Sequence, residues 1–221
     1  MRTRIKFCGL VRPGDVDTAV ALGVDACGFV FYPGSPRALQ PADAASLRAR
    51  LPSYVCAVGL FVNEDPRRVR AIASRTGLDV VQFHGDESPA DCSASTPEGI
   101  AFWRAVRMRG PADLLESLAQ FGAAEALLLD SFSDGFGGSG RRFDWGWIPE
   151  RRARPLVLSG GLDAGSVGEA IARVRPMGVD VSSGIQGSDA RVKDKAKMER
   201  FVAAVVAADA NSSTSGAAPH R

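Results

Sequence analysis

The sequence has few of the residues that metal and redox sites require. It contains two histidines, His84 and His220, and four widely spaced cysteines with no Cys-x-x-Cys pair. A zinc site, a dithiol redox site and a structural disulfide are therefore not expected, and no cofactor is predicted. Cys27 and Cys56 lie inside apolar runs and are interpreted as small buried side chains.

The sequence also lacks a strong net charge and a long apolar run. Its formal charge is +2, which favours neither a nucleic-acid nor a membrane partner. A membrane-spanning helix needs about 18 consecutive apolar residues, and no stretch of the sequence is that long. Residues 1–4 carry no apolar signal region. We therefore expect a cytoplasmic protein, while monomer and homodimer both remain open.

What the sequence does contain is a repeated alternation of short apolar runs and amphipathic segments. An apolar run of about four to eight residues predicts a buried strand, and apolar residues at i, i+3 and i+4 predict a helix. Helices are expected between successive strands, opening near residues 13, 41, 65, 89, 111 and 144. Another is expected over residues 167–174, and a last helix around 198–206. The predicted strands are 4–9, 25–31, 55–62, 79–83, 100–106, 125–130, 155–158 and 178–181.

Eight strand–helix units predict an α/β fold, a single (β/α)8 TIM barrel with short loops. A doubly wound open sheet is the structural alternative. The catalytic domain is expected to cover residues 1–208. Residues 209–221 are rich in Ser, Ala and Asn and poor in large apolar side chains, so they are predicted to form a disordered tail.

Chemically active side chains stand where predicted strands end, which is the active-site face of such a barrel. They are Cys8, Arg37, His84 and Asp130. Asp130 follows three leucines, and a dry environment favours the protonated form of a general acid. Lys6 shares a strand face with Cys8 and is expected to supply a positive field. Each of these residues also has a purely structural alternative. Cys8 could be a packed core residue, Asp130 a helix cap or salt-bridge partner, Arg37 a surface residue and His84 a structural residue.

Two glycine-containing loops after the last two strands predict a phosphate site, since backbone N–H groups in such loops bind anions. The candidate ligands are Gly160, Gly161, Ser182, Ser183 and Gly184. A short extra helix is expected within 183–187. The alternative is that these glycines only form tight turns.

A third glycine cluster matches a nucleotide-binding pattern by its letters alone. Gly135, Gly137 and Gly140 have dinucleotide-fingerprint spacing, but they do not directly follow a strand and no helix opens after them. We interpret this segment as a lid beside Asp130.

Taken together, these motifs resemble those of the phosphoribosylanthranilate isomerase family of tryptophan biosynthesis. The resemblance covers nearly the whole chain. It rests on residues 6–10, 28–37, 58–63, 81–87, 128–131, 137–145, 158–162 and 179–184.

The resemblance implies a cofactor-free Amadori rearrangement of a small phosphorylated substrate, N-(5-phosphoribosyl)anthranilate. By this resemblance Asp130 is the general acid that opens the furanose ring, and Cys8 is the general base at C2 of the sugar. Arg37 holds the anthranilate carboxylate, and the two glycine loops hold the phosphate. His84 and Asp180 match positions near the substrate.

The chain departs from the family pattern after the eighth strand. A glutamate usually follows the Ser-Ser-Gly motif, and a Pro-Gly-Lys-Lys-Asp turn comes later. Here Gln186 and residues 190–194 occupy this region, so a locally different loop is expected. The functional alternatives are the related histidine-pathway aminoimidazole ribotide isomerase, which Cys8 disfavours, and a non-catalytic barrel that binds phosphorylated metabolites.

Overall fold

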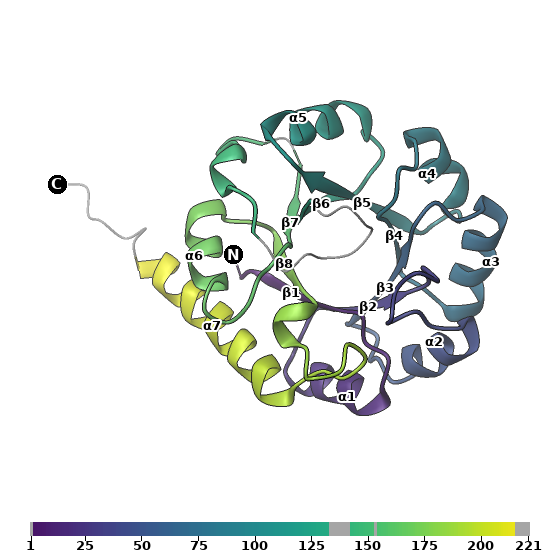
Figure 1. Cartoon of the computed structure of the whole chain (residues 1–221), viewed down its shortest axis with the longest axis horizontal. Helices are drawn as coiled ribbons and strands as arrows, with labels where there is room; N and C mark the ends of the chain where they lie inside the picture. Colours follow the sequence, from purple (N-terminus) through teal and green to yellow (C-terminus); the bar gives the residue numbers. More distant parts are fainter. Residues whose placement is uncertain (1, 133–141, 153, 215–221) are drawn as a thin grey trace.

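The chain forms a closed barrel of eight parallel strands in sequence order. The computed structural model describes residues 2–132, 142–152 and 154–214. Figure 1 looks down the barrel, and its helices surround the ring of strands. The strands are β1 (Arg4–Cys8), β2 (Ala26–Val30), β3 (Cys56–Phe61), β4 (Val80–Phe83), β5 (Ala101–Met108), β6 (Ala126–Ser131), β7 (Leu156–Leu158) and β8 (Gly178–Val181). The predicted (β/α)8 barrel is confirmed.

Proline defines where the first five helices begin. Each of these helices has proline at its first position, where the missing N–H would have no intrahelical partner. The α-helices are α1 (Pro13–Ala21), α2 (Pro41–Arg48), α3 (Pro66–Thr76), α4 (Pro89–Ser95), α5 (Pro111–Gln120), α6 (Val167–Val174) and α7 (Lys195–Thr214). Two 3-10 turns complete the fold, η1 (Trp145–Trp147) and η2 (Ser183–Ile185), both in segments where a short helix is predicted.

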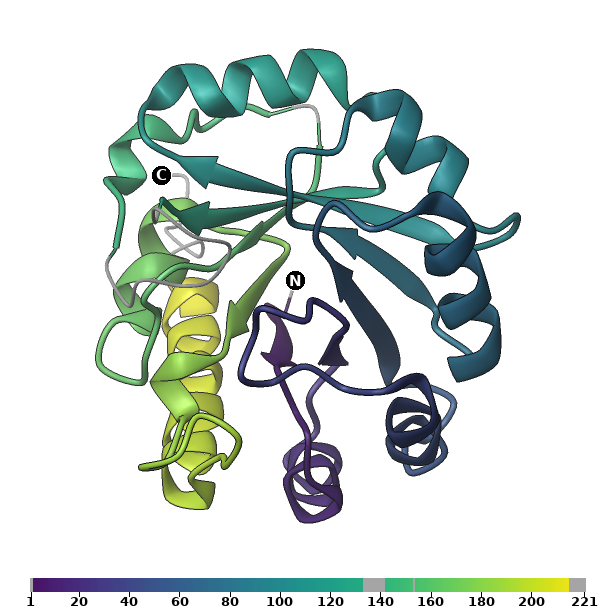
Figure 2. The same ribbon diagram turned by 45° about the vertical axis from the view of Figure 1, so that its right-hand side comes forward.

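Strand alternation separates a large outer core from a small barrel interior. Phenylalanines on the outer strand faces pack under the helices; Phe7 meets Phe201 of α7 edge to face, with ring centroids 6.1 Å apart. The interior positions near the start of the strands are small, such as Ala26 and Ala126. Figure 2 shows the strands from the side, inside this helical layer. The polar residues of the interior gather toward the carboxyl ends of the strands.

The last helix extends beyond the boundary expected from the sequence. Helix α7 continues to Thr214, so residues 209–214 are helical and not part of a tail. The Asp209 carboxylate accepts hydrogen bonds from the backbone N–H and the hydroxyl of Thr3, each at 2.7 Å. This contact joins α7 to the residue before β1, 206 positions away in the sequence. The remaining residues of the predicted tail, 215–221, lie outside the described residues.

Two further expectations from the sequence are the lid beside Asp130 and the absence of a membrane span. The predicted lid contains Gly135, Gly137 and Gly140, which lie outside the described residues. Within the described ranges, none of the helices has the length and apolar character needed to cross a membrane.

Candidate active site

A cavity at the carboxyl ends of the strands brings most of the predicted site residues together. Its walls also include Gln82, Ser159 and residues of the loop after β2. The predicted residues that line it are Cys8, Arg37, His84, Asp130, Gly160, Gly161, Asp180, Ser182 and Ser183. Among the predicted residues, Gly184 is not part of its lining.

Cys8 ends β1 beside a buried lysine. Cys8 is one of the groups that attract the Lys6 ammonium, and both side chains lie against Gly28 of the neighbouring strand. A Cβ at Gly28 would lie 2.9 Å from the Cys8 Sγ and 3.2 Å from the Lys6 Nζ. The absence of a side chain at Gly28 therefore provides the space in which the thiol and the ammonium meet.

Lys6 is held as a cation by a buried ion pair. Its Nζ donates to Asp180 Oδ1 at 2.7 Å, and Ser159 Oγ donates to Asp180 Oδ2 at 3.1 Å. Burial would lower the pKa of Lys6, but attraction by Asp180 and Cys8 outweighs it and raises the pKa above its usual value. A permanently charged ammonium thus stands next to Cys8 and stabilises negative charge on its sulfur.

Asp130 ends β6 and belongs to a second buried network. Its Oδ1 accepts a hydrogen bond from Ser131 N at 2.8 Å, and its Oδ2 lies 3.2 Å from His84 Nε2. On the other side of the ring, Gln82 Nε2 lies 3.1 Å from His84 Nδ1. Gln82, His84 and Asp130 therefore form a chain from β4 to β6.

The side-chain amide of Gln82 sets the donor and acceptor roles along this row of hydrogen bonds. When Gln82 donates to His84 Nδ1, the neutral imidazole carries its proton on Nε2 and donates it to Asp130. In this arrangement the Nε2–H of His84 is the donor and Asp130 Oδ2 the acceptor. The Gln82 Oε1 atom is buried and has no hydrogen-bond partner among the described atoms. Because Gln82 lines the cavity, this oxygen is available to a donor on a bound molecule.

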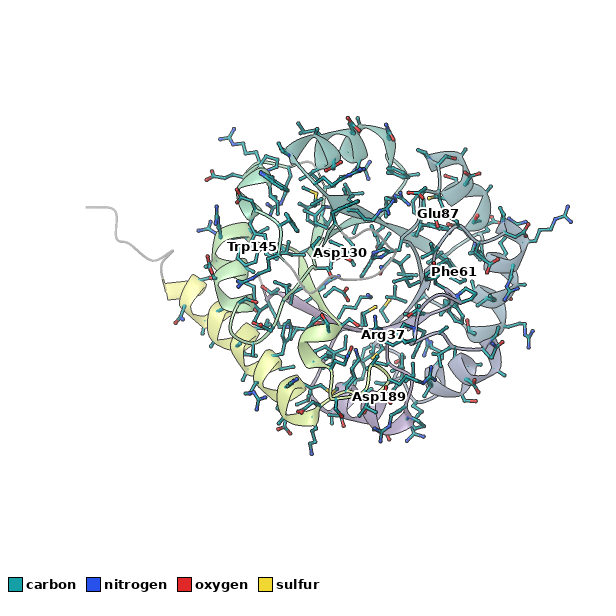
Figure 3. All side chains as sticks on the ribbon, in the orientation of Figure 1. Arg37, Phe61, Glu87, Asp130, Trp145 and Asp189 are labelled. Carbon is teal, nitrogen blue, oxygen red and sulfur yellow. The ribbon has the colours of Figure 1, made fainter. Side chains whose placement is uncertain are left out.

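The turn that carries His84 is fixed by a buried carboxylate behind it. Glu87 accepts hydrogen bonds from Asn63 N at 2.6 Å and Gly85 N at 2.9 Å. Arg104 of β5 donates to the same Glu87 carboxylate at 2.7 Å and to Gly85 O at 2.9 Å. Figure 3 places Glu87 near α4, outside the centre of the barrel where Asp130 lies. Glu87 thus orients the end of β4 without lining the cavity.

Arg37 lies in the loop after β2. Its guanidinium passes close to Gly9, and its Nη1 donates to Gln186 Oε1 at 3.3 Å. Gln186 is neutral, so this contact orients the guanidinium without neutralising it. Arg191 donates to Pro36 O at 2.7 Å and ties the same loop to the segment after β8. The Arg37 guanidinium is therefore fixed in position at the cavity wall, and its positive charge is not neutralised by its partner Gln186.

The glycine loops have different local roles. Gly160 has a φ of +84°, and a Cβ there would lie 2.6 Å from Ser131 N and 3.1 Å from Asp130 Oδ1. Gly184 faces the loop after β7, where a Cβ would lie 2.0 Å from Leu162 O. Gly160 therefore permits the approach of the β6 and β7 ends, whereas Gly184 allows the two loops to pack together.

The site contains residues that the sequence analysis did not identify. Gln82 stands two positions before His84 on the same strand face, and this alternation is a signal that could have found it. Ser159 directly follows β7, and its bond to Asp180 depends on the pairing of β7 with β8. Lys193, buried behind Ser182, carries no comparable signal in its local sequence.

The remaining cysteines are not part of the site. Cys27 and Cys92 are fully buried, as expected for Cys27, whereas Cys56 is only partly buried. Burial raises the pKa of all three thiols to about 12. Within the described residues, no group of three or more His, Cys, Asp or Glu side chains could hold a metal ion.

Comparison with known proteins assigns this architecture to one family of enzymes. The sequence model of N-(5'-phosphoribosyl)anthranilate (PRA) isomerase matches residues 5–204. The N-(5'-phosphoribosyl)anthranilate isomerase of Dechloromonas aromatica is 52% identical over 209 residues, covering 95% of this chain and 99% of that protein. The isomerase of Methylibium petroleiphilum is 50% identical over 210 residues, covering 95% and 97%.

Solved structures agree with the sequence relatives. Phosphoribosyl anthranilate isomerase from Thermotoga maritima superposes with a TM-score of 0.86 at 39% identity, covering 93% of this chain and 99% of that one. A phosphoribosyl anthranilate isomerase in complex with reduced 1-(o-carboxyphenylamino)-1-deoxyribulose 5-phosphate has a TM-score of 0.82 at 37% identity, with the same coverage.

Proposed function

This chain belongs to the N-(5'-phosphoribosyl)anthranilate isomerase family, and from that premise we propose how the residues of its cavity divide the reaction. The reaction is an aldose–ketose isomerisation, the Amadori rearrangement of phosphoribosylanthranilate in tryptophan biosynthesis. Family membership decides against the histidine-pathway isomerase and the non-catalytic barrel. The observation that carries the proposal is that Cys8, Asp130 and both glycine loops line one cavity.

Asp130 acts first as the general acid. It donates a proton to the furanose ring oxygen, the C1–O bond breaks, and the anthranilate nitrogen forms a Schiff base with C1. Asp130 is left as a carboxylate, which accepts a hydrogen bond from His84 Nε2 at 3.2 Å. Because stabilising the carboxylate makes proton donation easier, His84 assists the ring opening.

Cys8 acts second as the general base. Its thiolate, stabilised by the Lys6 ammonium, removes the proton from C2, and the electron pair moves toward the Schiff base to give an enolamine. C1 then gains a proton and the C2 hydroxyl loses one, so the product is the ketone isomer with no net change in atoms. Proton transfers by placed groups typically accelerate a step by about 100- to 10,000-fold each.

The two anionic ends of the substrate are held by different groups in the cavity wall. Arg37, which no carboxylate neutralises among the described residues, binds the anthranilate carboxylate. Gly160, Gly161, Ser182 and Ser183 bind the phosphate at the other end. Asp180 acts through Lys6, and Gly184 supports the loops.

We predict that Cys8→Ala and Asp130→Asn each lower kcat by about 100- to 10,000-fold, because each removes a proton-transfer group. The measurement is the change in anthranilate-derived fluorescence as the substrate is consumed. Cys92→Ala and Asp43→Asn are matched controls, since Cys92 is a buried thiol outside the cavity and Asp43 an exposed carboxylate on α2. Near-normal turnover of both site variants would refute these assignments.

Several wider expectations remain predictions. They are a cytoplasmic location, the absence of nucleic-acid and membrane partners, and catalysis without a cofactor. A phosphorylated small-molecule substrate is supported by the solved complex with a phosphorylated analogue.

A further inference from the structure

Lys193 is a buried ammonium to which the reaction assigns no role. It is 5% exposed, and its Nζ donates to Ser182 O at 2.9 Å and to Ser182 Oγ at 3.3 Å. Both acceptors are uncharged. Across the described ranges, no carboxylate oxygen lies within 4.0 Å of this Nζ, whereas Lys6 has its own carboxylate partner.

The segment after β8 holds this lysine firmly in place. Lys193 N donates to Asp15 Oδ2 of α1 at 3.1 Å, and Lys193 pairs in an antiparallel bridge with Gln186. Asp194 N donates to Ile185 O at 2.9 Å and closes the same loop. The position of the ammonium is therefore set by the backbone and by α1.

Four charged or titratable groups surround the ammonium, and none of them neutralises it at close range. They are Cys8 on β1, Asp15 on α1, Arg37 in the loop after β2, and Asp180 on β8. Asp180 is already paired with Lys6, and Asp15 accepts the backbone N–H of Lys193. Burial lowers the pKa of Lys193 to about 8, against the opposing attraction of the three acidic groups. A buried charge of this kind is costly unless a partner compensates it.

We propose that Lys193 is a phosphate-binding charge, and that its counter-ion is the phosphate dianion held against Ser182 and Ser183. This inference rests on the proposed function of the cavity. Ser182 lies directly between the ammonium and the cavity, because it accepts two bonds from Lys193 and also lines the cavity wall.

The bond to the Ser182 carbonyl has a second effect on the same anion site. In a trans peptide the C=O and the following N–H point in opposite directions, and the described backbone contains no cis peptide. By holding Ser182 O, Lys193 turns the N–H of Ser183 away from itself. Lys193 thus contributes both a positive charge and the orientation of a backbone donor.

A titratable cation at the phosphate makes affinity depend on pH. Below pH 8 the ammonium is charged before the ligand arrives, and above this value it must first take up a proton. Affinity for a phosphate dianion is therefore expected to fall by up to about tenfold per pH unit above pH 8. Glycerol 3-phosphate is a suitable probe, since phosphomonoesters, with a second pKa of about 6, remain dianionic throughout this range.

The test measures competitive inhibition of the isomerase by glycerol 3-phosphate between pH 7 and 9.5. Lys193→Met should raise the inhibition constant by about tenfold or more at pH 7.5 and abolish its rise above pH 8, with a smaller effect on kcat. Lys193→Arg should keep tight binding at pH 7.5 and also at pH 9, because guanidinium does not titrate there. Lys195→Met removes an exposed lysine nearby and should leave inhibition unchanged.

An unchanged inhibition constant in Lys193→Met would overturn the proposal, as would a loss confined to kcat. A rise above pH 8 that persists in Lys193→Arg would also contradict it. If Lys193→Met does not fold by circular dichroism, the pH profile of Lys193→Arg decides the question. Activity of the wild-type chain separates the two proposals: an inactive wild type refutes the proposed function, whereas an active one with these negative results refutes only the role of Lys193.

Discussion

At the scale of single residues, the chemistry depends on which charges are already paired. Lys6 is matched by Asp180, so its charge is permanent and its position is fixed. Arg37 and Lys193 contact only neutral acceptors at close range within the described residues. These two cations therefore stand where a substrate with a carboxylate and a phosphate would bind.

Gln82 offers a test of how the general acid is positioned. We predict that Gln82→Met lowers kcat by about 2- to 12-fold with little change in KM, because a hydrogen bond to a neutral group contributes about 0.5–1.5 kcal/mol. The pH profile of kcat should also shift, since the His84 tautomer is no longer set by the amide. Steady-state kinetics by the fluorescence assay measures both effects.

A double-mutant cycle distinguishes positioning from simple packing. If Gln82 acts through His84, then Gln82→Met should have little further effect in a His84→Gln background. Additive losses in the two variants would show that Gln82 does not act through the imidazole.

At the scale of elements, the site depends on how closely the ends of β6 and β7 approach each other. Gly160 lies against Ser131 N and the Asp130 carboxylate in a conformation with positive φ. The turn after β4 is held in a similar way by Glu87 and Arg104, which do not reach the cavity. Strand ends are thus positioned by backbone contacts and buried ion pairs, and the reacting side chains follow.

We predict that Gly160→Ala lowers kcat/KM by about 5- to 150-fold, because the new methyl group displaces Ser131 and Asp130 at a cost of about 1–3 kcal/mol. Gly77→Ala is the matched control. Gly77 also has a positive φ, of +64°, but a Cβ there meets no atom within 4 Å. It should lose stability by about 1 kcal/mol and keep its kcat. Comparable kinetics in the two variants would argue against a specific role for Gly160.

At the scale of the whole molecule, the buried ammonium of Lys193 favours phosphate binding but destabilises the folded protein. Unfolded, this lysine keeps its proton up to its usual pKa of 10.5, whereas in the folded chain it loses the proton near pH 8. Between these values the unfolded chain binds more protons, so this group's contribution to stability rises with pH. Below pH 8 its full destabilising effect is present, of the order of 3 kcal/mol.

Lys193→Met is therefore expected to be more stable than the wild type at pH 7. The predicted gain is about 2 kcal/mol after allowing about 1 kcal/mol for lost hydrogen bonds, and it should shrink toward pH 10.5. Urea unfolding of both proteins at pH 7 and pH 9.5 measures this difference, and contributions from other titrating groups cancel between them. A difference that stays constant with pH would contradict the assignment.

Much of the architecture could be predicted because its signals are local. Apolar runs, helical periodicity and proline at helix starts depend on neighbouring residues, so the order of strands and helices was predictable, as was the barrel. The end of α7 was not, because residues 209–214 lack the large apolar side chains whose spacing predicts a helix, and Asp209 contacts Thr3 at the other end of the chain.

The sequence by itself determined which chemically active residues end the strands, and the parallel order of those strands then places Cys8, Asp130 and the glycine loops at one face. Only the tertiary structure decided how these groups are tuned. Three features of this tuning depend on strand register and barrel closure. They are the pairing of Lys6 with Asp180, the orientation of His84 by Gln82 and the burial of Lys193 behind Ser182. The Lys6–Asp180 pair joins residues 174 positions apart. No local pattern encodes such a contact, because it exists only once the first and last strands meet.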